Sequence, residues 1–406
     1  MVGVTTAPTT KWILLALLVS VTWAPRTWAR MLFAPANPVP VDKRPRFMTV
    51  QDIDLDGVDD VLLVSTRGTL TVLYGSSASP TLFTAPRVST FGKRLRRPAL
   101  GDVDGDGVTD IAIADESGGG IWVLLGTGAR RFAPPRFVPV DGFRPYTVAI
   151  ADIDGRGGGD LVVGERRSGR VRLRLNSAEF SFRDGSLLVA RDGAERLECS
   201  DLNGDLLPEV IVISTGHRGR ISVFAASESR SGTAEYSNAV VFATQSNDAS
   251  LTIADFDGNG TRDLATLERP RGARNSRVVV RTGNSDTTFT SSMSVDAECI
   301  GYRRGRACRA RGIAAADFDG DGVVDIAIGL RGQSSIGALQ TRRAGVVSIL
   351  RGRGDTFIAG ALAPWLEKTP TALGAGDFNG DGLPDIVSIS RSRSSLQAML
   401  NLSSPD

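Results

Sequence analysis

The stretch that decides the fold is "DVDGDGVTD" at residues 102–110, with aspartates at positions 1, 3, 5 and 9 and a glycine at position 6. Carboxylates this close repel one another unless a cation lies among them. Six related stretches occur: "DIDLDGVDD" (52–60), "DIDGRGGGD" (152–160), "DLNGDLLPE" (201–209), "DFDGNGTRD" (255–263), "DFDGDGVVD" (317–325) and "DFNGDGLPD" (377–385). Seven copies at intervals of 49 to 62 residues indicate a repeat protein with one acidic loop per unit.

Each repeat contains four strand patterns. In residues 97–140, "PALGDV" precedes the acidic loop, and "DIAIAD", "IWVLLG" and "RFAPPRFVPV" follow it. Four short strands in each of seven units predict an all-β fold, a seven-bladed β-propeller of four-stranded blades. The last repeat offers only two strands after its loop, and "MLFAPANPVPV" at residues 31–41 supplies a fourth. We therefore expect the N-terminal strand to pair into the last blade and close the ring.

The N-terminus has the pattern of a secretory signal peptide. Lys11 precedes an apolar run at residues 12–24, and small residues stand at Thr27 and Ala29. This predicts a signal peptide at residues 1–29, with an uncleaved membrane anchor as the alternative. The remaining residues, 30–406, are expected to form a single propeller without a membrane span. We predict a monomer that is secreted, periplasmic or held at the cell surface.

The acidic loops have the spacing of a calcium site. Oxygens at positions 1, 3, 5 and 9 converge when a glycine at position 6 permits a sharp turn, and a backbone carbonyl near position 7 completes the shell. Several hard, charged oxygens suit Ca²⁺ better than Mg²⁺, which keeps its waters. A solvated acidic turn is the alternative. Three loops have four acids: Asp52, Asp54, Asp56 and Asp60; Asp102, Asp104, Asp106 and Asp110; Asp317, Asp319, Asp321 and Asp325. Two loops replace one acid by an amide: Asp255, Asp257, Asn259 and Asp263; Asp377, Asn379, Asp381 and Asp385.

The third and fourth loops depart from this pattern. Arg156 occupies position 5 of the third loop, where its guanidinium is expected to replace the metal by bridging Asp152 and Asp160. Leu206 stands where the fourth loop needs glycine, and a positive φ is costly there. Its candidate ligands are Asp201, Asn203, Asp205 and Glu209. We predict about five structural calcium sites, with the third loop empty and the fourth left open.

The segments "DFDGDGVVDIAIG" and "DFNGDGLPDIVSIS" resemble FG-GAP/VCBS repeats, the calcium-bearing blades of integrin α-subunit propellers and of many secreted bacterial proteins. The resemblance covers about residues 31–406 and implies that the loop acids named above bind calcium. The chain has no counterpart of the stalk domains or membrane span of an integrin subunit, so an adhesion receptor is not implied. Some fungal lectins and polysaccharide lyases share such blades, and the fold therefore leaves the function open.

The sequence offers few residues for catalysis. His217 is its single histidine, which excludes metal sites built from several histidines and restricts any catalytic triad to this residue. We therefore expect a non-enzymatic binding or adhesion module. The main alternative is a carbohydrate-active enzyme, either a polysaccharide lyase or a hydrolase, because carboxylate pairs are abundant. A purely structural surface component is a third possibility.

Arginine-rich segments indicate where a ligand would bind. The chain has 43 arginines and four lysines, and many arginines fall in turns expected on the face opposite the calcium loops. Candidate ligand-binding residues are Arg166, Arg167, Arg271, Arg274, Arg303, Arg304, Arg342 and Arg343. Arginine recognises carboxylate, sulfate and phosphate with two parallel hydrogen bonds. The expected partner is an acidic glycan or an extracellular protein, and codon preference is the alternative explanation of the bias.

Two further expectations concern partners and cross-links. Nucleic acid is disfavoured as a ligand because the chain is expected to be exported and aromatic residues do not interleave with the basic clusters. Cys299 and Cys308 bracket a short loop and could form a disulfide in an oxidising compartment.

Overall fold

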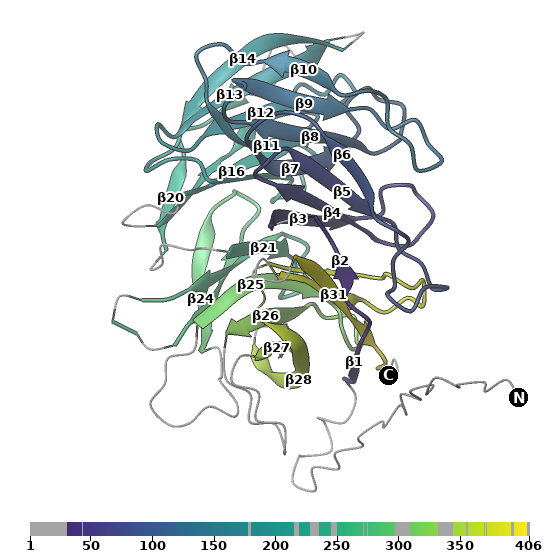
Figure 1. Cartoon of the computed structure of the whole chain (residues 1–406). Coiled ribbons are helices and arrows are strands. Elements are labelled where there is room, and N and C mark those ends of the chain that lie inside the picture. Colours follow the sequence, from purple (N-terminus) through teal and green to yellow (C-terminus); the bar gives the residue numbers. More distant parts are fainter. Residues whose placement is uncertain are drawn as a thin grey trace, which may run out of the picture.

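The computed structural model describes residues 31–403 except 43, 178–179, 215–218, 228–234, 245–249, 271, 274, 297–308, 332–343, 355, 369, 371 and 391–393. These residues form seven four-stranded antiparallel blades arranged in a ring, and no helix occurs among them (Figure 1). The all-β, seven-bladed propeller predicted from the repeats is confirmed. The predicted signal peptide at residues 1–29 lies outside the described residues.

The first four blades follow one another along the chain. Blade 1 contains β3 (Pro45–Gln51), β4 (Asp60–Ser65), β5 (Thr69–Leu73) and β6 (Arg87–Thr90). Blade 2 contains β7 (Leu95–Gly101), β8 (Asp110–Asp115), β9 (Gly120–Leu124) and β10 (Arg136–Pro139). Blade 3 contains β11 (Pro145–Ala151), β12 (Asp160–Glu165), β13 (Arg170–Ser177) and β14 (Ser181–Val189). Blade 4 contains β15 (Arg196–Ser200), β16 (Glu209–Ser214), β17 (Arg220–Phe224) and β20 (Val240–Ala243), and a small hairpin of β18 (Ala226–Ser227) and β19 (Glu235–Tyr236) precedes its last strand.

The last three blades complete the ring. Blade 5 contains β21 (Ser250–Ala254), β22 (Asp263–Glu268), β23 (Arg277–Gly283) and β24 (Phe289–Asp296). Blade 6 contains β25 (Arg309–Ala316), β26 (Asp325–Arg331), β27 (Ala344–Gly352) and β28 (Phe357–Lys368). Blade 7 contains β29 (Leu373–Gly376), β30 (Asp385–Ser390) and β31 (Ser395–Asn401), with β1 (Phe33–Pro35) and β2 (Val39–Pro40) from the N-terminal side.

The N-terminal segment closes the ring as the sequence predicted. β1 pairs antiparallel with β31, placing Phe33 opposite Asn401, and β2 pairs with the beginning of the same strand. A second connection joins blades 1 and 7 through their acidic loops. The amide N–H of Asp59 donates to the carbonyl oxygen of Asp377 at 2.7 Å, and the Asp377 N–H donates to the Asp59 carboxylate at 2.9 Å. Blade 7 is therefore built from both ends of the described chain.

The core lies between the blades. The second strand of six blades is buried at every residue, because neighbouring blades cover both of its faces. This explains why these strands read as continuous apolar runs such as "DIAIAD". Seven hydrophobic clusters occur, one at each interface between consecutive blades. Burial of apolar surface between blades is thus the main force that holds the ring together.

The second residue of each acidic loop anchors the loop in this core. In blades 5, 6 and 7 that residue is Phe256, Phe318 or Phe378, each almost fully buried. Phe378 packs on Phe83 of blade 1, with ring centroids 5.1 Å apart. The loop backbone is therefore held by the interface behind it.

No helix long and apolar enough to cross a membrane is found in the described part of the chain.

Candidate metal centre

The acid at position 9 connects two turns in six of the seven blades. In loop 2, Asp110 Oδ2 accepts the N–H of Val103 at 2.7 Å, and its Oδ1 accepts the N–H of Gly126 at 2.6 Å. Gly126 begins the turn between the third and fourth strands, so this turn lies beside the acidic loop. The same two bonds recur in loop 6, where Asp325 accepts from Phe318 at 2.9 Å and from Gly352 at 2.7 Å. The position-9 acid is therefore part of the scaffold as well as a candidate ligand.

Burial raises the pKa values of the position-9 acids. The position-9 acids of all seven loops are at most 1% exposed. Burial raises the pKa of Asp60, Asp325 and Asp385 to about 7, although backbone N–H groups oppose the shift. It raises the pKa of Asp110 to about 6 for the same reason. A cation bound beside such a carboxylate favours its ionised form.

The acid at position 1 organises the loop backbone. In loop 2, the two oxygens of Asp102 accept the N–H groups of Gly105 at 2.7 Å and of Gly107 at 2.8 Å. Both glycines have φ near +80°, which side chains disfavour. In the fourth loop Leu206 adopts φ +70° and is 88% exposed. The positive φ expected at this position is thus present even without glycine.

Three of the four candidate ligands converge. In five loops, one carboxylate oxygen from each of positions 1, 3 and 9 lies within 4.8 Å of the other two. These triads are Asp52, Asp54 and Asp60; Asp102, Asp104 and Asp110; Asp152, Asp154 and Asp160; Asp255, Asp257 and Asp263; Asp317, Asp319 and Asp325. The structure therefore contains five acidic clusters that can hold metal ions.

Position 5 does not belong to these triads. Asp106 Oδ1 accepts the N–H of Val108, two residues further on, at 2.8 Å, and Asp56, Asp205, Asn259, Asp321 and Asp381 make the same local contact. Such an Asx turn uses one side-chain oxygen. The second oxygen of Asp106 stays available, whereas Asn259 has no second oxygen and the second oxygens of Asp56 and Asp321 pair with arginines. The sequence placed positions 1, 3, 5 and 9 together as one ligand set, and the structure gathers only three of them.

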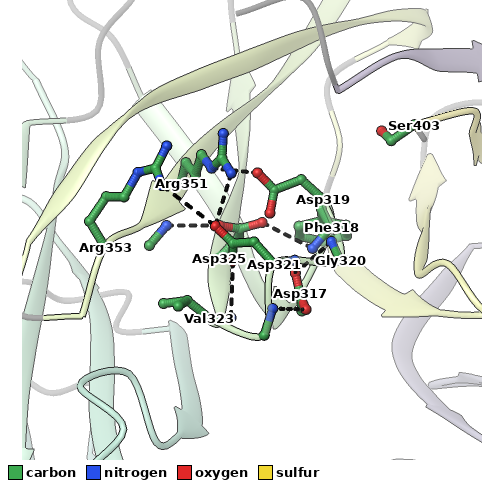
Figure 2. A network of polar contacts seen from close by, with 12 residues as sticks. Asp317, Phe318, Asp319, Gly320, Asp321, Val323, Asp325, Arg351, Arg353 and Ser403 are labelled. Carbon is green, nitrogen blue, oxygen red and sulfur yellow. Dashed lines mark hydrogen bonds and ion pairs between the residues drawn. The ribbon is translucent and has the colours of Figure 1, made fainter. Parts of the chain in front are cut away.

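Arginines occupy two of the loops with complete acid sets. In loop 6, the Arg351 guanidinium forms ion pairs with Asp319 and Asp321, and Arg353 lies 3.7 Å from Asp321 (Figure 2). In loop 1, Arg130 pairs with Asp54 and, at 2.6 Å, with Asp56. Arg130 comes from the turn after β9 in the next blade, whereas Arg351 lies on β27 of the same blade. The positive charge that the acids need is thus partly supplied by the protein itself.

The third loop corrects one prediction. The guanidinium of Arg156 does not bridge Asp152 and Asp160; its Nε lies 3.7 Å from Asp154 Oδ2. Arg183 of β14 approaches the same oxygen, at 3.2 Å. Arg156 follows the glycine at position 4, and from there its side chain reaches the position-3 acid. That this loop holds no metal stays a prediction: Asp152, Asp154 and Asp160 converge as in the other four triads, and two arginines lie beside Asp154.

The remaining loops contain no such arginine. Among the described residues, no lysine or arginine forms an ion pair with the acids of loops 2, 4, 5 or 7. In loop 7, the amide of Asn379 donates to Asp381 at 2.9 Å, and its Oδ1 accepts the Asp381 N–H at 3.1 Å and keeps a second lone pair as a candidate ligand. In loop 4, Glu209 replaces aspartate and its Oε1 is buried without a hydrogen bond. Whether loop 4 binds metal stays open.

The donor set fits a calcium ion. Each triad offers carboxylate oxygens only, and these are the ligands that Ca²⁺ prefers. In loop 1, Oδ1 of Asp54 is buried and accepts no hydrogen bond, and Oδ1 of Asp319 in loop 6 is in the same condition. Buried carboxylate oxygens without donors are unfavourable unless a cation lies near them. These two oxygens are therefore candidate metal ligands in loops where an arginine already lies beside the same carboxylate.

The predicted ligand-binding arginines are described only in part. Arg166 is exposed, and its Nε donates to Glu195 at 2.8 Å. Arg167 is exposed and forms no ion pair within the described ranges. Nearby, Glu116 pairs with Arg94 and Arg96, so part of the positive charge is balanced. The other candidates, together with His217 and the predicted Cys299–Cys308 pair, lie outside the described residues: Arg271, Arg274, Arg303, Arg304, Arg342 and Arg343.

The fold and these loops define a β-propeller with an acidic turn after the first strand of each blade. The sequence profile described as an FG-GAP-like repeat matches residues 52–113, 102–163 and 201–266. These three matched repeats and the seven blades fit an FG-GAP repeat protein. A search of curated proteins found no match.

Solved structures share the architecture at low sequence identity. BBS1N in complex with ARL6DN, soaked with lead, is 13% identical with a TM-score of 0.57, covering 91% of this chain and 97% of that chain. Raptor of Chaetomium thermophilum is 10% identical with a TM-score of 0.59, covering 94% of this chain and 30% of that chain. Likeness at this level of identity shows the propeller fold alone.

Sequence reasoning missed the arginines that enter loops 1 and 6. Arg130 stands 76 residues from Asp54, and Arg351 stands 30 residues from Asp321. A basic residue next to the turn between the third and fourth strands was the available signal, because this turn lies on the same face as the acidic loop.

Proposed function

We propose that this protein is an exported, calcium-stabilised propeller that binds a partner and does not catalyse a reaction. The observation that carries the proposal is the convergence of position-1, position-3 and position-9 carboxylates in five loops. Bound calcium would neutralise these carboxylates and tie the first and second strands of a blade together. Stability would then depend on calcium by mass action, and weak sites would suffice outside a cell.

The pattern of shifted pKa values favours a scaffold over an active site. Strongly shifted carboxylates often mark catalytic residues. Here burial raises the pKa of Asp60, Asp325 and Asp385, and each of them is a position-9 acid with both oxygens bound to backbone N–H groups. The recurrence of the same arrangement in successive blades is what a structural role requires.

An acidic glycan is the ligand class that we propose, with an extracellular protein as the alternative. Support comes from the exposed Arg166 and Arg167 and from the arginine-rich segments of the sequence. The Arg166–Glu195 ion pair would have to open, so binding should be weak for single sugars and stronger for a chain that presents several charges.

Two experiments test this function. Calcium added to the chelated protein should raise its melting temperature far more than magnesium does, and equal effects of both ions would contradict calcium sites.

A screen of the mature protein in millimolar calcium against neutral and acidic glycans should give salt-sensitive binding to acidic glycans. Silence from protein that is shown to be folded would favour a protein partner, and turnover of a glycan would favour the carbohydrate-active enzyme.

A further inference from the structure

The centre of the ring contains a pocket that the acidic loops do not explain. A cavity of about 230 Å³ lies between β3, β7, β11 and β15, the inner strands of the first four blades. Most of its lining residues are uncharged, for example Met48, Ala99 and Thr49, and the surface that the lining exposes to the cavity is mainly polar. The charged residues of the lining are Arg97, Arg196 and Glu198. Charges in such a place need partners, and their pairing decides what the pocket can hold.

The two arginines occupy the same level of the ring. Arg97 in blade 2 and Arg196 in blade 4 each lie five residues before the first aspartate of their acidic loop. Thr147 has the same place in blade 3, between them. The corresponding residues of the other blades are uncharged: Phe47, Ser250, Gly312 and Ala372. The repeat therefore brings two guanidinium groups to one side of the ring centre and none to the other.

Arg97 has no acidic partner. Its Nε is buried without a hydrogen bond, the residue as a whole is half-buried, and among the described residues its side chain forms neither a hydrogen bond nor an ion pair. The ring of Phe47 lies 5.3 Å from its guanidinium carbon and fixes one face of the group. Burial, and next to it the charge of Arg196, lowers the pKa of Arg97 to about 10, so it remains charged at neutral pH. An unpaired cation in a lined cavity is unfavourable until an anion joins it.

Arg196 is already paired. Its Nε donates to Glu198 Oε1 at 2.6 Å, and the two side chains are 28% and 36% exposed. These exposures show that solvent reaches this part of the pocket, so a small ligand can enter. One negative charge against two positive charges leaves the lining with one uncompensated positive charge, located on Arg97.

We propose that this pocket binds a small oxyanion, a carboxylate, sulfate or phosphate group, on Arg97 with Arg196 beside it. Guanidinium groups bind such groups through parallel, charge-assisted hydrogen bonds. The volume suits a single charged group and not a polymer chain. The site uses neither the acidic loops nor the exposed arginines of the proposed glycan surface, so it can be tested whatever the outcome for them.

The test is calorimetric titration of the calcium-loaded protein with sodium sulfate and with sodium acetate at constant ionic strength, with chloride as the balancing salt. The R97M variant should weaken binding by about tenfold or more, because the charged donors are lost. The R46M variant is the matched control. Arg46 contacts the same Phe47 ring, at 5.5 Å, but does not line the cavity, and its replacement should leave affinity unchanged.

Removal of the competing acid gives an independent test with the opposite sign. The E198Q variant frees Arg196 from its partner and should bind sulfate several times more tightly than the natural chain. This variant decides the matter if R97M does not fold. Absence of binding to the natural chain, equal weakening by R97M and R46M, or no gain from E198Q would each overturn the proposal.

Discussion

Loops 2 and 6 have almost the same sequence, "DVDGDGVTD" and "DFDGDGVVD", and yet they differ in what surrounds their acids. In loop 6, Arg351 pairs with the acids at positions 3 and 5 (Figure 2). In loop 2, Asp104 and Asp106 are exposed and no arginine in the described part of the chain contacts them. Two loops with one consensus therefore have different electrostatic environments.

The difference shows in the protonation of one acid of loop 6: burial raises the pKa of the position-3 acids Asp104 and Asp319 in both loops, whereas the pKa of Asp321 at position 5 is lowered. Burial and the neighbouring Asp106 raise the pKa of Asp104, since no cation compensates the repulsion. Burial also acts to raise the pKa of Asp321, but the hydrogen bonds from Arg351 and from the Val323 N–H, together with the charges of Arg351 and Arg353, outweigh it and the pKa lies below its ordinary value. A loop motif thus defines where ligands stand, and the residues around it determine how strongly they attract a metal ion. Three experiments test how far this distinction extends.

The largest effect on stability should come from replacing the position-9 acid, which accepts two backbone N–H groups in both loops. In Asp110 and Asp325 both carboxylate oxygens accept a backbone N–H. D110N and D325N each replace one of these oxygens by an NH₂ group, which cannot accept, so one buried N–H loses its partner. Each should lower the free energy of unfolding by about 2 to 4 kcal/mol, the range for a buried donor left unsatisfied next to a lost charged acceptor. The measurement is urea denaturation in the presence of a chelator.

The exposed Asp106 supplies the control for this pair. D106N keeps an oxygen that can accept the N–H of Val108, so its effect should stay below about 1 kcal/mol. A small effect of D325N alongside a large effect of D110N would mean that Arg351, and not the backbone contacts, holds loop 6.

An intermediate effect, on calcium affinity, should come from removing the arginine that lies beside the acids of loop 6 and is lacking in loop 2 among the described residues. R351M removes the cation from loop 6 and should tighten calcium binding there by about tenfold to a hundredfold, since a guanidinium at this distance opposes a divalent cation by a few kcal/mol. Equilibrium dialysis with radioactive calcium should then show an additional tight site. R130M should do the same in loop 1.

Arg136 supplies the matched control. It is exposed, lies 4.3 Å over the ring of Phe180 and contacts no acid of the loops. R136M should therefore leave calcium binding unchanged. Unchanged stoichiometry in R351M would show that loop 6 binds calcium as well as loop 2 does, with the arginine displaced by the ion.

The smallest effect concerns the loop backbone. Leu206 holds φ +70° at an exposed position where other loops have glycine. A left-handed conformation costs an ordinary residue about 1 to 2 kcal/mol, and glycine loses about 0.5 to 1 kcal/mol in chain entropy. L206G should therefore raise the free energy of unfolding by about 0.5 to 1 kcal/mol in urea denaturation.

Leu55 provides a second instance in loop 1, with φ +61° and 60% exposure. L55G should stabilise the protein by a similar amount. Loss of stability in both variants would contradict the strain argument and point to contacts of the leucine side chains.

The sequence by itself determined the number of blades, the closure of the ring and the position of the loops. The reason is that these features depend on local patterns: strand alternation, turn glycines such as Gly107, and one acid that contacts backbone atoms nearby. Repetition strengthens such signals: a single copy could be an isolated acidic turn, whereas seven copies at intervals of 49 to 62 residues indicate a repeat architecture. The ligand positions 1, 3 and 9 follow from the same local geometry.

Only the tertiary structure decided which loops contain an arginine and where the unpaired Arg97 lies. Arg130 reaches loop 1 from the next blade across 76 residues of sequence, and Arg97 and Arg196 line the same cavity because their blades surround it. A long arginine side chain has many rotamers and no fixed sequence distance to its partner. Its contacts therefore depend on how the blades pack, which the loop motif does not encode.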